Sequence, residues 1–205
     1  LPSALGEYIK LVEEFTPHKY PGSPLIAARL LRPKDRLIAI EKHPEEHEAL
    51  VGILKPHTNA RVVLGDGYRQ LLKWLPPAER RGVILIDPPF EATDEFESAI
   101  AALIAAQVKF ATGIFLLWYP MKARGTAERA IGELLNGGIT RLLRLELDIG
   151  HAKDVEDRSL TATGLLVVNP PFGFSTEMEK ILPVLVNRLA KGSDAKARVE
   201  RLTGD

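Results

Sequence analysis

Residues 82–90 read GVILIDPPF, and residues 164–172 read GLLVVNPPF, which is a near copy. In both, an apolar run ends in a carboxylate or an amide that two prolines and a phenylalanine follow. An uninterrupted apolar run of this length is typical of a strand that is buried on both faces, as in the parallel sheets of α/β proteins. The first copy therefore predicts a buried strand that ends at Asp87.

Comparable apolar runs lie on both sides of this strand along the chain. Residues 36–41 and 60–67 form such runs before it, and residues 113–120 form one after it. Segments in which apolar residues recur at helical spacing separate the runs. This alternation of strand and helix predicts a Rossmann-like α/β fold with a mostly parallel sheet and helices on both of its faces.

The pattern changes after Gly138. Two strand-like runs, 139–149 and 161–170, are joined by the charged segment 150–159 with no helix between them. Strands that follow one another without a crossover helix are normally antiparallel. We therefore expect an antiparallel addition at one end of the sheet.

The length of 205 residues is typical of one domain, and an apolar share of 45% is sufficient for a core. A terminal segment rich in charge is often mobile. The expected organisation comprises N-terminal helices over 1–35, an α/β domain over 36–190 and a polar, mobile C-terminal tail over 191–205.

Composition narrows the classes of function. The chain has no cysteine, which excludes disulfides and thiolate metal sites and fits a reducing cytoplasm. It has no apolar run long enough to span a membrane, and we expect no membrane partner. Lys plus Arg equals Asp plus Glu, 27 against 27, so any nucleic-acid site must be a local patch. Basic clusters at 79–82, 121–130 and 191–201 are interleaved with acids and are interpreted as solvated faces.

The residues that follow the first three runs are candidate ligand contacts. They are Glu41, then Asp66 with Gly67, then Asp87. Ligands of open parallel sheets bind outside the carboxyl ends of the strands. Taken singly, each acid is more often a solvated strand end or a turn residue. Taken together they suggest a ligand of the nucleoside type, with Glu41 on the ribose hydroxyls.

The tetrapeptide DPPF suits one kind of substrate, an exocyclic amine on a base. Such an amine is a poor nucleophile unless its lone pair is aimed at the electrophile. The carboxylate of Asp87 and the carbonyl of Pro88 can accept its two N–H bonds, and the ring of Phe90 can stack on the base. Two prolines stiffen the loop, although a Pro-Pro pair can also simply turn the chain.

At this point the chain resembles a known family, the S-adenosylmethionine-dependent adenine-N6 methyltransferases of the RlmJ type, which modify 23S ribosomal RNA. The resemblance covers nearly the whole chain. It is carried by YPGSPLIAARLL (20–31), EKHP (41–44), ARVVLGDG (60–67), RRGVILIDPPFE (80–91), FATGIFLLWYP (110–120) and TATGLLVVNPPF (161–172).

The resemblance implies a class I methyltransferase sheet within residues 36–190 and S-adenosylmethionine as the cofactor. It implies that Ser23, Glu41, Asp66 and Gly67 bind this cofactor, and that the catalytic residues are Asp87, Pro88 and Phe90. It also implies that residues 1–35 cap the cofactor site. The expected partner is 23S ribosomal RNA, protein-free or as an early precursor, for a cytoplasmic monomer. No metal site is expected.

The resemblance also distinguishes the two copies of the motif. The catalytic tetrapeptide of such proteins follows the fourth strand of the sheet, which is the position of Asp87, whereas Asn169 falls at the end of the last strand. Asn169 is then structural and lines the rim, although substrate binding by the second copy stays open as an alternative.

One departure from the family is a missing first strand with its glycine-containing cofactor loop, which would precede residue 1. A chain without that strand leaves two strands with unpaired edges. The sequence is therefore interpreted as a fragment of a longer protein, with a degenerate relative that no longer binds the cofactor as the alternative.

Several residues have a second interpretation. Ser23 is equally a helix cap with Pro24 at the first helical position, and the N–H groups of that helix could also hold the carboxylate of the cofactor. His43 and His47 have a spacing that could bind a metal, but no third ligand is evident. Trp118 and Tyr119 are assigned to the core rather than to a base-binding site.

Rival functions also remain. A DNA adenine-N6 methyltransferase shares the tetrapeptide DPPF, and a catalytically inactive nucleic-acid-binding relative would fit the missing strand. Protein glutamine methylation uses an asparagine in the first position of the motif, and Asp87 argues against it.

Overall fold

The computed structural model describes the chain except for residues 18, 91, 93, 122–124, 152–159 and 204–205. Most of the charged segment that joins the last two predicted strands lies outside the described residues. The chain forms two compact units rather than one, an N-terminal unit (Leu1–Lys73) and a C-terminal unit (Trp74–Asp205). None of the helices in the described ranges has the length and apolar character needed to cross a membrane.

The N-terminal unit contains two parallel strands and four helices. Its β1 and β2 pair in register from Leu37 with Ala60 to Glu41 with Leu64, so both strands end at the same edge. The elements are α1 (Ser3–Glu13), α2 (Ser23–Leu30), β1 (Leu37–Glu41), α3 (Pro44–Leu54), β2 (Ala60–Leu64) and α4 (Gly67–Leu71).

The core of the N-terminal unit is small. Ala28 of α2, Ala39 of β1 and Leu54 of α3 are buried against one another. Two of these three side chains are alanines, whose size allows both helices to approach the strand closely. Pro44 begins α3, where a proline costs no hydrogen bond. The two helices therefore pack against the strands and hold them in place.

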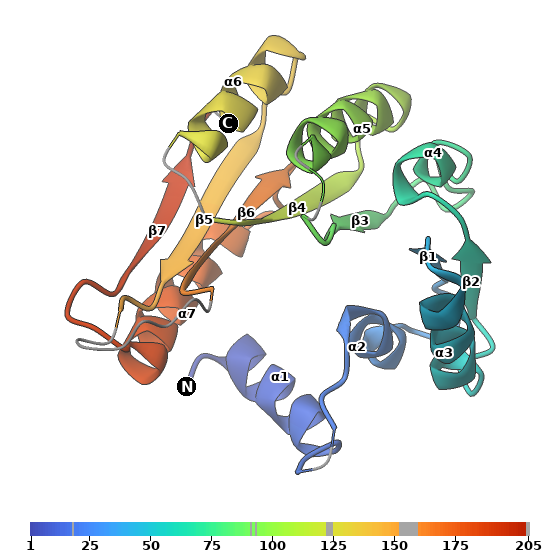
Figure 1. The fold of residues 1–205 in the computed structure, drawn as a ribbon, viewed down its shortest axis with the longest axis horizontal. Helices are drawn as coiled ribbons and strands as arrows, with labels where there is room; N and C mark the ends of the chain where they lie inside the picture. Colours follow the sequence, from blue (N-terminus) through green and yellow to red (C-terminus); the bar gives the residue numbers. More distant parts are fainter. Residues whose placement is uncertain (18, 91, 93, 122–124, 152–159, 204–205) are drawn as a thin grey trace. The chain divides into compact units, whose positions relative to one another are not determined.

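The C-terminal unit is built on five strands in the order β3-β4-β6-β5-β7 (Figure 1). Strand β3 is parallel to β4, and the other three pairs are antiparallel. The predicted antiparallel end of the sheet is confirmed. The elements are β3 (Val83–Ile86), α5 (Glu95–Lys109), β4 (Ile114–Pro120), α6 (Thr126–Asn136), β5 (Leu142–Asp148), β6 (Ala162–Val168), α7 (Phe174–Leu189) and β7 (Lys196–Arg201).

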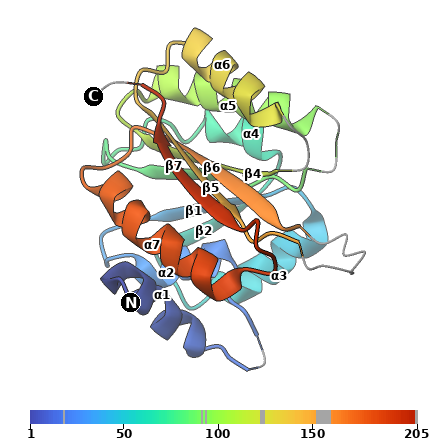
Figure 2. The same ribbon diagram turned by 90° about the vertical axis from the view of Figure 1, so that its left-hand side faces the viewer.

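Helices cover both faces of this five-stranded sheet (Figure 2). Helices α5 and α6 lie on one face, where Phe115, Leu117 and Tyr119 of β4 are buried. Helix α7 lies on the other face, where Leu182 packs with the alternate residues of the central strands, including Leu143. A strand that is apolar on both faces reads as a continuous run, which explains the sequence of β4.

The expectation of a mobile tail from Lys191 is wrong for residues 196–201. These residues form β7, which pairs with β5 from Leu143 with Arg201 to Asp148 with Lys196. In KARVER, Val199 packs on the α7 face, and by alternation Ala197 and Arg201 belong to the same face of the strand. Three of the four charges that suggested a solvated tail, those of Lys196, Arg198 and Glu200, lie on the other face, where each pairs with a charged residue of β5.

Each of the two sheets has two edge strands in the described part of the chain, β1 and β2 in the first and β3 and β7 in the second. Val83 and Leu85 of the edge strand β3 are apolar and exposed. The expectation that a missing strand leaves two strands with unpaired edges stays a prediction.

Candidate active site

Two carboxylates lie at the ends of the parallel strands in the N-terminal unit. Glu41 is the last residue of β1, and its Oε1 accepts a hydrogen bond of 2.8 Å from the backbone N–H of His43. Asp66 follows β2 and caps α4, because its Oδ1 accepts a bond of 3.1 Å from the N–H of Arg69. Each carboxylate therefore has one oxygen engaged by the backbone, which fixes its direction, and a second oxygen with which it can bind a ligand.

The other two predicted cofactor residues occupy the first positions of helices. Gly67 begins α4, and a side chain there would meet no atom within 4 Å, so the space beside its backbone is open. Ser23 is not the cap of α2, as the sequence suggested. Gly22 holds the cap position, with no side-chain hydrogen bond, and Ser23 is the first helical residue. Its hydroxyl is thus not used for capping.

His43 is the residue that precedes α3, and its carbonyl accepts the N–H of His47. Over the described ranges, no three His, Asp or Glu side chains are grouped so that they could hold a metal ion.

Asp87 lies at the carboxyl edge of the C-terminal unit, which we define as the edge at which β3 and β4 end. It follows Ile86, which pairs with Leu117. The side chain of Asp87 is exposed, whereas Pro88 is buried and anchors the loop. Although Asp87 is exposed, the protein that surrounds it removes part of its hydration, and this burial raises its pKa.

Phe90 completes this loop and packs within a cluster of aromatic rings. Its ring centroid is 5.8 Å from that of Phe96 on α5 and 5.7 Å from that of Trp118 on β4. Its φ is 53°, in the left-handed region that side chains other than glycine rarely adopt. The loop therefore has a fixed shape. Because the ring is only half-buried, part of it can still contact a base.

The second copy of the motif lies at the opposite edge of the sheet. Strand β6 runs antiparallel to β4, and its last residue, Val168, pairs with Phe115 near the start of β4. Asn169 therefore lies at the amino edge, which we define as the edge at which β3 and β4 begin. The expectation that Asn169 lines the same rim as Asp87 is wrong. Because β6 runs antiparallel to β4, the carboxyl end of β6 lies at the edge opposite Asp87.

Asn169 has a structural role at this edge. Its Nδ2 donates hydrogen bonds of 2.8 Å to the carbonyls of Ala111 and Gly113, and its N–H donates to the carbonyl of Arg141. Its φ is 53°, a conformation in which asparagine is favoured. The side chain and the backbone of Asn169 together thus join the end of β6 to the starts of β4 and β5.

This role predicts that replacing Asn169 lowers stability. Asn169→Ala should cost about 1–3 kcal/mol of unfolding free energy, because two carbonyls lose their donor. Asn169→Asp should cost more, since a carboxylate cannot donate and would face both carbonyl oxygens. Urea unfolding monitored by circular dichroism measures both. A variant that retains full stability but loses methyl transfer would show that Asn169 acts in the reaction.

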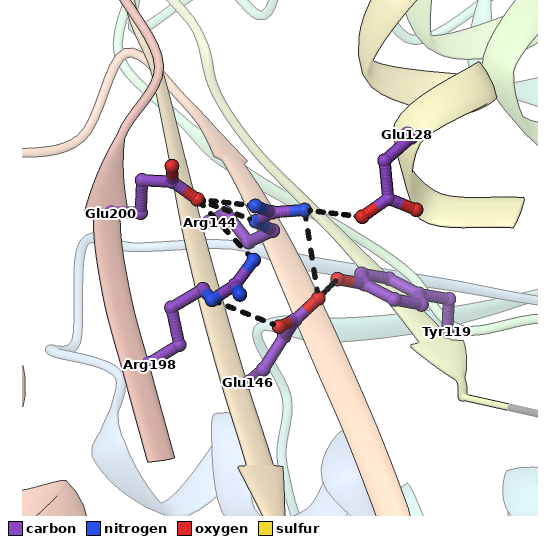
Figure 3. Close-up of polar contacts among 6 residues, drawn as sticks. All are labelled: Tyr119, Glu128, Arg144, Glu146, Arg198 and Glu200. Carbon is purple, nitrogen blue, oxygen red and sulfur yellow. Dashed lines mark hydrogen bonds and ion pairs between the residues drawn. The ribbon is translucent and has the colours of Figure 1, made fainter. Parts of the chain in front are cut away.

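A network of charged groups joins α6, β4, β5 and β7 on one face of the same sheet (Figure 3). Arg144 of β5, with 7% of its side chain exposed, lies at its centre. Its Nε donates to Glu200 of β7 at 2.9 Å, and its Nη1 is 3.2 Å from Glu128 of α6 and 3.8 Å from Glu146. Burial alone would lower the pKa of Arg144, but Glu200 and Glu146 raise it, so it stays charged.

Tyr119 connects this network to the aromatic cluster. Its hydroxyl donates to Glu146 at 3.0 Å, and its ring centroid is 5.9 Å from that of Phe96. Burial and the charge of Glu146 raise the pKa of Tyr119, which keeps the donor protonated. Gly164 of β6 has no side chain, and any Cβ there would overlap the Tyr119 ring. Phe96 thus lies between the network and Phe90.

The sequence interpretation missed this network, although a signal was present. In RLLRLELDI, Arg144 and Glu146 alternate with leucines, as expected for polar residues on one face of a strand. The assignment of Trp118 and Tyr119 to the core is confirmed for Tyr119, which is buried, and the half-buried Trp118 packs against Phe90.

The predicted site residues fall into the two units. Ser23, Glu41, Asp66 and Gly67 belong to the N-terminal unit, and the tetrapeptide from Asp87 to Phe90 belongs to the C-terminal unit. Within the first unit, the pairing of β1 with β2 brings Glu41 and Asp66 to one edge. Within the second, β3 and β4 bring Asp87 and Trp118 to one edge.

Comparisons with known proteins identify the family of the chain. The family model described as "RsmJ: Ribosomal RNA large subunit methyltransferase D, RlmJ" matches residues 1–203. Ribosomal RNA large subunit methyltransferase J of Escherichia coli is 38% identical over 97% of this chain and 72% of its own length. The protein of the same name from Haemophilus influenzae is 36% identical over 99% of this chain and 73% of its own length.

A solved structure agrees as well. The crystal structure of a Legionella pneumophila protein superposes with a TM-score of 0.85, at 32% identity, and the match covers 98% of this chain and 75% of that one. The family model spans nearly the whole chain, and both named relatives exceed a third in identity over most of their own length. The chain therefore belongs to the RlmJ family of large-subunit ribosomal RNA methyltransferases.

Proposed function

We propose that this protein methylates the N6 amine of an adenine in 23S ribosomal RNA, with S-adenosylmethionine as the methyl donor and Asp87 as the residue that holds the amine. The observation that carries the proposal is the loop from Asp87 to Phe90. It presents an exposed carboxylate at the end of a parallel strand, and a buried proline and two aromatic contacts fix its shape.

The loop supplies what the chemistry of an aromatic amine requires. The Asp87 carboxylate and the Pro88 carbonyl accept the two N–H bonds, so that the nitrogen lone pair is directed away from the loop. As the N–C bond forms, positive charge develops on the nitrogen, and the carboxylate stabilises this charge and orients the loss of one proton. The exposed part of the Phe90 ring stacks on the base.

The polar groups of the N-terminal unit fit the cofactor. S-adenosylmethionine supplies an electrophilic methyl group when bound. The second oxygen of Glu41 can accept ribose hydroxyls, and Asp66 offers an oxygen of the same kind at the end of the neighbouring strand. The space beside the Gly67 backbone is open, so the cofactor can approach it closely. The Ser23 hydroxyl does not cap α2, so it can form a hydrogen bond with the polar end of the cofactor. These four residues would hold the cofactor.

The substrate adenine must be unpaired or flipped out of its helix, because its amine otherwise takes part in base pairing. We propose protein-free 23S ribosomal RNA or an early precursor as the substrate, since an assembled subunit would bury most adenines. A cytoplasmic monomer is sufficient for this reaction, because both sets of residues belong to one chain.

The raised pKa of Asp87 predicts a specific pH dependence. Only the ionised carboxylate accepts the amine N–H bonds, so kcat/KM should fall as the pH drops through the raised pKa. The acid limb is therefore expected above the pH range in which an ordinary aspartate titrates. Single-turnover methyl transfer measured across acidic to neutral pH tests this. An acid limb in the pH range in which an ordinary aspartate titrates would show that burial does not raise the pKa of Asp87.

The function itself is tested by radiolabelled methyl transfer from S-adenosylmethionine with the full-length protein. Protein-free 23S ribosomal RNA and duplex DNA serve as substrates, and each is digested to nucleosides after the reaction. N6-methyladenosine from RNA alone is the expected result. Label in DNA alone would favour a DNA adenine methyltransferase, and the absence of both label and cofactor binding would leave an inactive nucleic-acid-binding relative.

A further inference from the structure

The loop that follows β6 displays an aromatic ring with no protein contact to account for it. Phe172 is 106% exposed, more than any other large apolar side chain in the described residues. An exposed phenylalanine gains nothing for the fold. Asn169, at the start of this loop, has a structural role in joining strands. That role does not explain why the tip of the loop exposes Phe172.

The loop is nevertheless held rigidly. Asn169 binds the carbonyls that precede β4, the Nη2 of Arg141 donates to the Pro170 carbonyl at 3.4 Å, and the N–H of Phe174 donates to the Pro171 carbonyl at 3.1 Å. Both prolines restrict the backbone further. The ring is therefore displayed on a fixed support, so it can bind a flat partner with little loss of conformational entropy.

Arginines surround this loop at the amino edge. Arg81 immediately precedes Gly82, whose carbonyl accepts the N–H of Ile114 at the start of β4, and Arg141 is bonded to Asn169. Because neighbouring strands lie about 4.8 Å apart, the backbone from Gly82 through Gly113 to Asn169 spans roughly 10 Å. The arginines thus lie on either side of the strand end that supports Phe172.

Three exposed basic side chains lie at this edge. Arg80, Arg81 and Arg141 are exposed, and none forms an ion pair with a residue that the structure describes. Of the acids nearby in sequence, Glu79 has a partner of its own, and Glu177 lies 3.7 Å from Lys180. Arg80 also has a positive φ, of 51°, so the turn that presents these arginines has a strained backbone.

We propose that Phe172, Arg80, Arg81 and Arg141 form a second RNA-binding surface, the amino-edge patch, on the edge of the sheet opposite Asp87. An unpaired base stacks on Phe172, and the arginines bind the flanking phosphates. This proposal rests on the proposed function only in taking RNA as the partner. A protein partner would need a larger apolar surface than one ring, whereas a ring among exposed arginines matches single-stranded nucleic acid.

The test measures RNA affinity rather than chemistry. Full-length protein is titrated into a fluorescein-labelled single-stranded RNA of mixed sequence, and the anisotropy gives Kd at several salt concentrations. Phe172→Ala should raise Kd by roughly tenfold, within the range for the loss of one stacked base. Arg81→Ala should raise Kd and make the dependence of log Kd on log salt shallower by about 0.7, as for one phosphate contact on a single strand.

Controls separate binding from folding. Phe172→Trp should keep the affinity, because tryptophan also stacks, and Phe172→Ala should melt at the wild-type temperature, because the ring is exposed. Leu189→Ala and Arg188→Ala change exposed residues at the far end of α7 and should bind RNA like the wild type. If the patch variants also bind like the wild type, or if Phe172→Ala instead changes the oligomeric state, the proposal is wrong.

The two proposals can fail separately. Methyl transfer at saturating RNA should be unchanged in Phe172→Ala, with only KM raised. Wild-type methylation together with unaltered RNA binding by the variants would overturn the amino-edge patch alone. RNA binding that depends on the patch, without methyl transfer by the wild type, would overturn the proposed function alone.

Discussion

Asp87→Ala is expected to lower the kcat of methyl transfer by about a thousandfold, because the amine loses both its acceptor and the carboxylate that stabilises its developing charge. Affinity for S-adenosylmethionine should change little, since the residues proposed to bind it belong to the N-terminal unit. Steady-state assays at saturating substrate give kcat, and isothermal titration calorimetry gives the cofactor affinity.

Asp87→Asn is the matched variant. It keeps the shape of the side chain but presents N–H groups on one side, so it should be nearly as inactive as Asp87→Ala. Because burial raises the pKa of Asp87, the ionised carboxylate opposes folding at neutral pH, and the neutral amide should melt no lower than the wild type. Full methyl transfer by either Asp87 variant would show that Asp87 takes no part in the mechanism. If methyl transfer were instead abolished in Asn169→Ala, the roles of the two copies of the motif would be reversed.

Arg144→Met should destabilise the C-terminal unit by about 3–5 kcal/mol, because it removes the buried charge at the centre of the network and leaves the mostly buried Glu146 with the half-exposed Arg198 as its counter-charge. Glu146 is 11% exposed and has Arg144 and Arg198 as its cationic partners. A loss of this size corresponds to a fall in melting temperature of roughly 10 °C. Differential scanning calorimetry measures it.

The neighbouring arginine provides the control. Arg198 joins the same network, but half of its side chain is exposed, so Arg198→Met should cost less than about 1 kcal/mol. Combining Arg144→Met with Glu146→Gln and Glu200→Gln should recover part of the loss, since the uncompensated charges are then removed. Equal losses in the two single variants would show that solvent screens Arg144 as well.

The elements with a continuous apolar run were predictable from sequence. The run that ends at Asp87 became β3, the run over 113–120 became β4, and the antiparallel pairing of β5 with β6 was anticipated because the sequence predicted no helix between the runs 139–149 and 161–170. The tetrapeptide from Asp87 to Phe90 was located for the same reason, since the residues directly after a strand lie at the edge of the sheet, although β3 is an edge strand with exposed Val83 and Leu85 rather than the buried strand that its sequence predicted.

The remaining features depend on pairing that no local pattern contains. The direction of β6, which puts Asn169 at the opposite edge from Asp87, is set by its neighbour β4. Strand β7 was interpreted as a tail because its sequence is rich in charge. The oppositely charged residues that it pairs with lie on β5, which is distant in sequence, so no local pattern revealed the pairing. The contact of Trp118 with Phe90 likewise depends on which strands are neighbours.

The network around Arg144 also has a consequence during synthesis of the protein. Arg144 precedes Glu200, with which it shares its hydrogen bonds, by 56 residues. At a typical rate of translation, roughly 3 to 11 seconds separate the appearance of the two side chains. Of the three carboxylates around Arg144, those of Glu128 and Glu146 are made within 16 residues of it, whereas that of Glu200 is made only with β7. The network is therefore incomplete until β7 has left the ribosome.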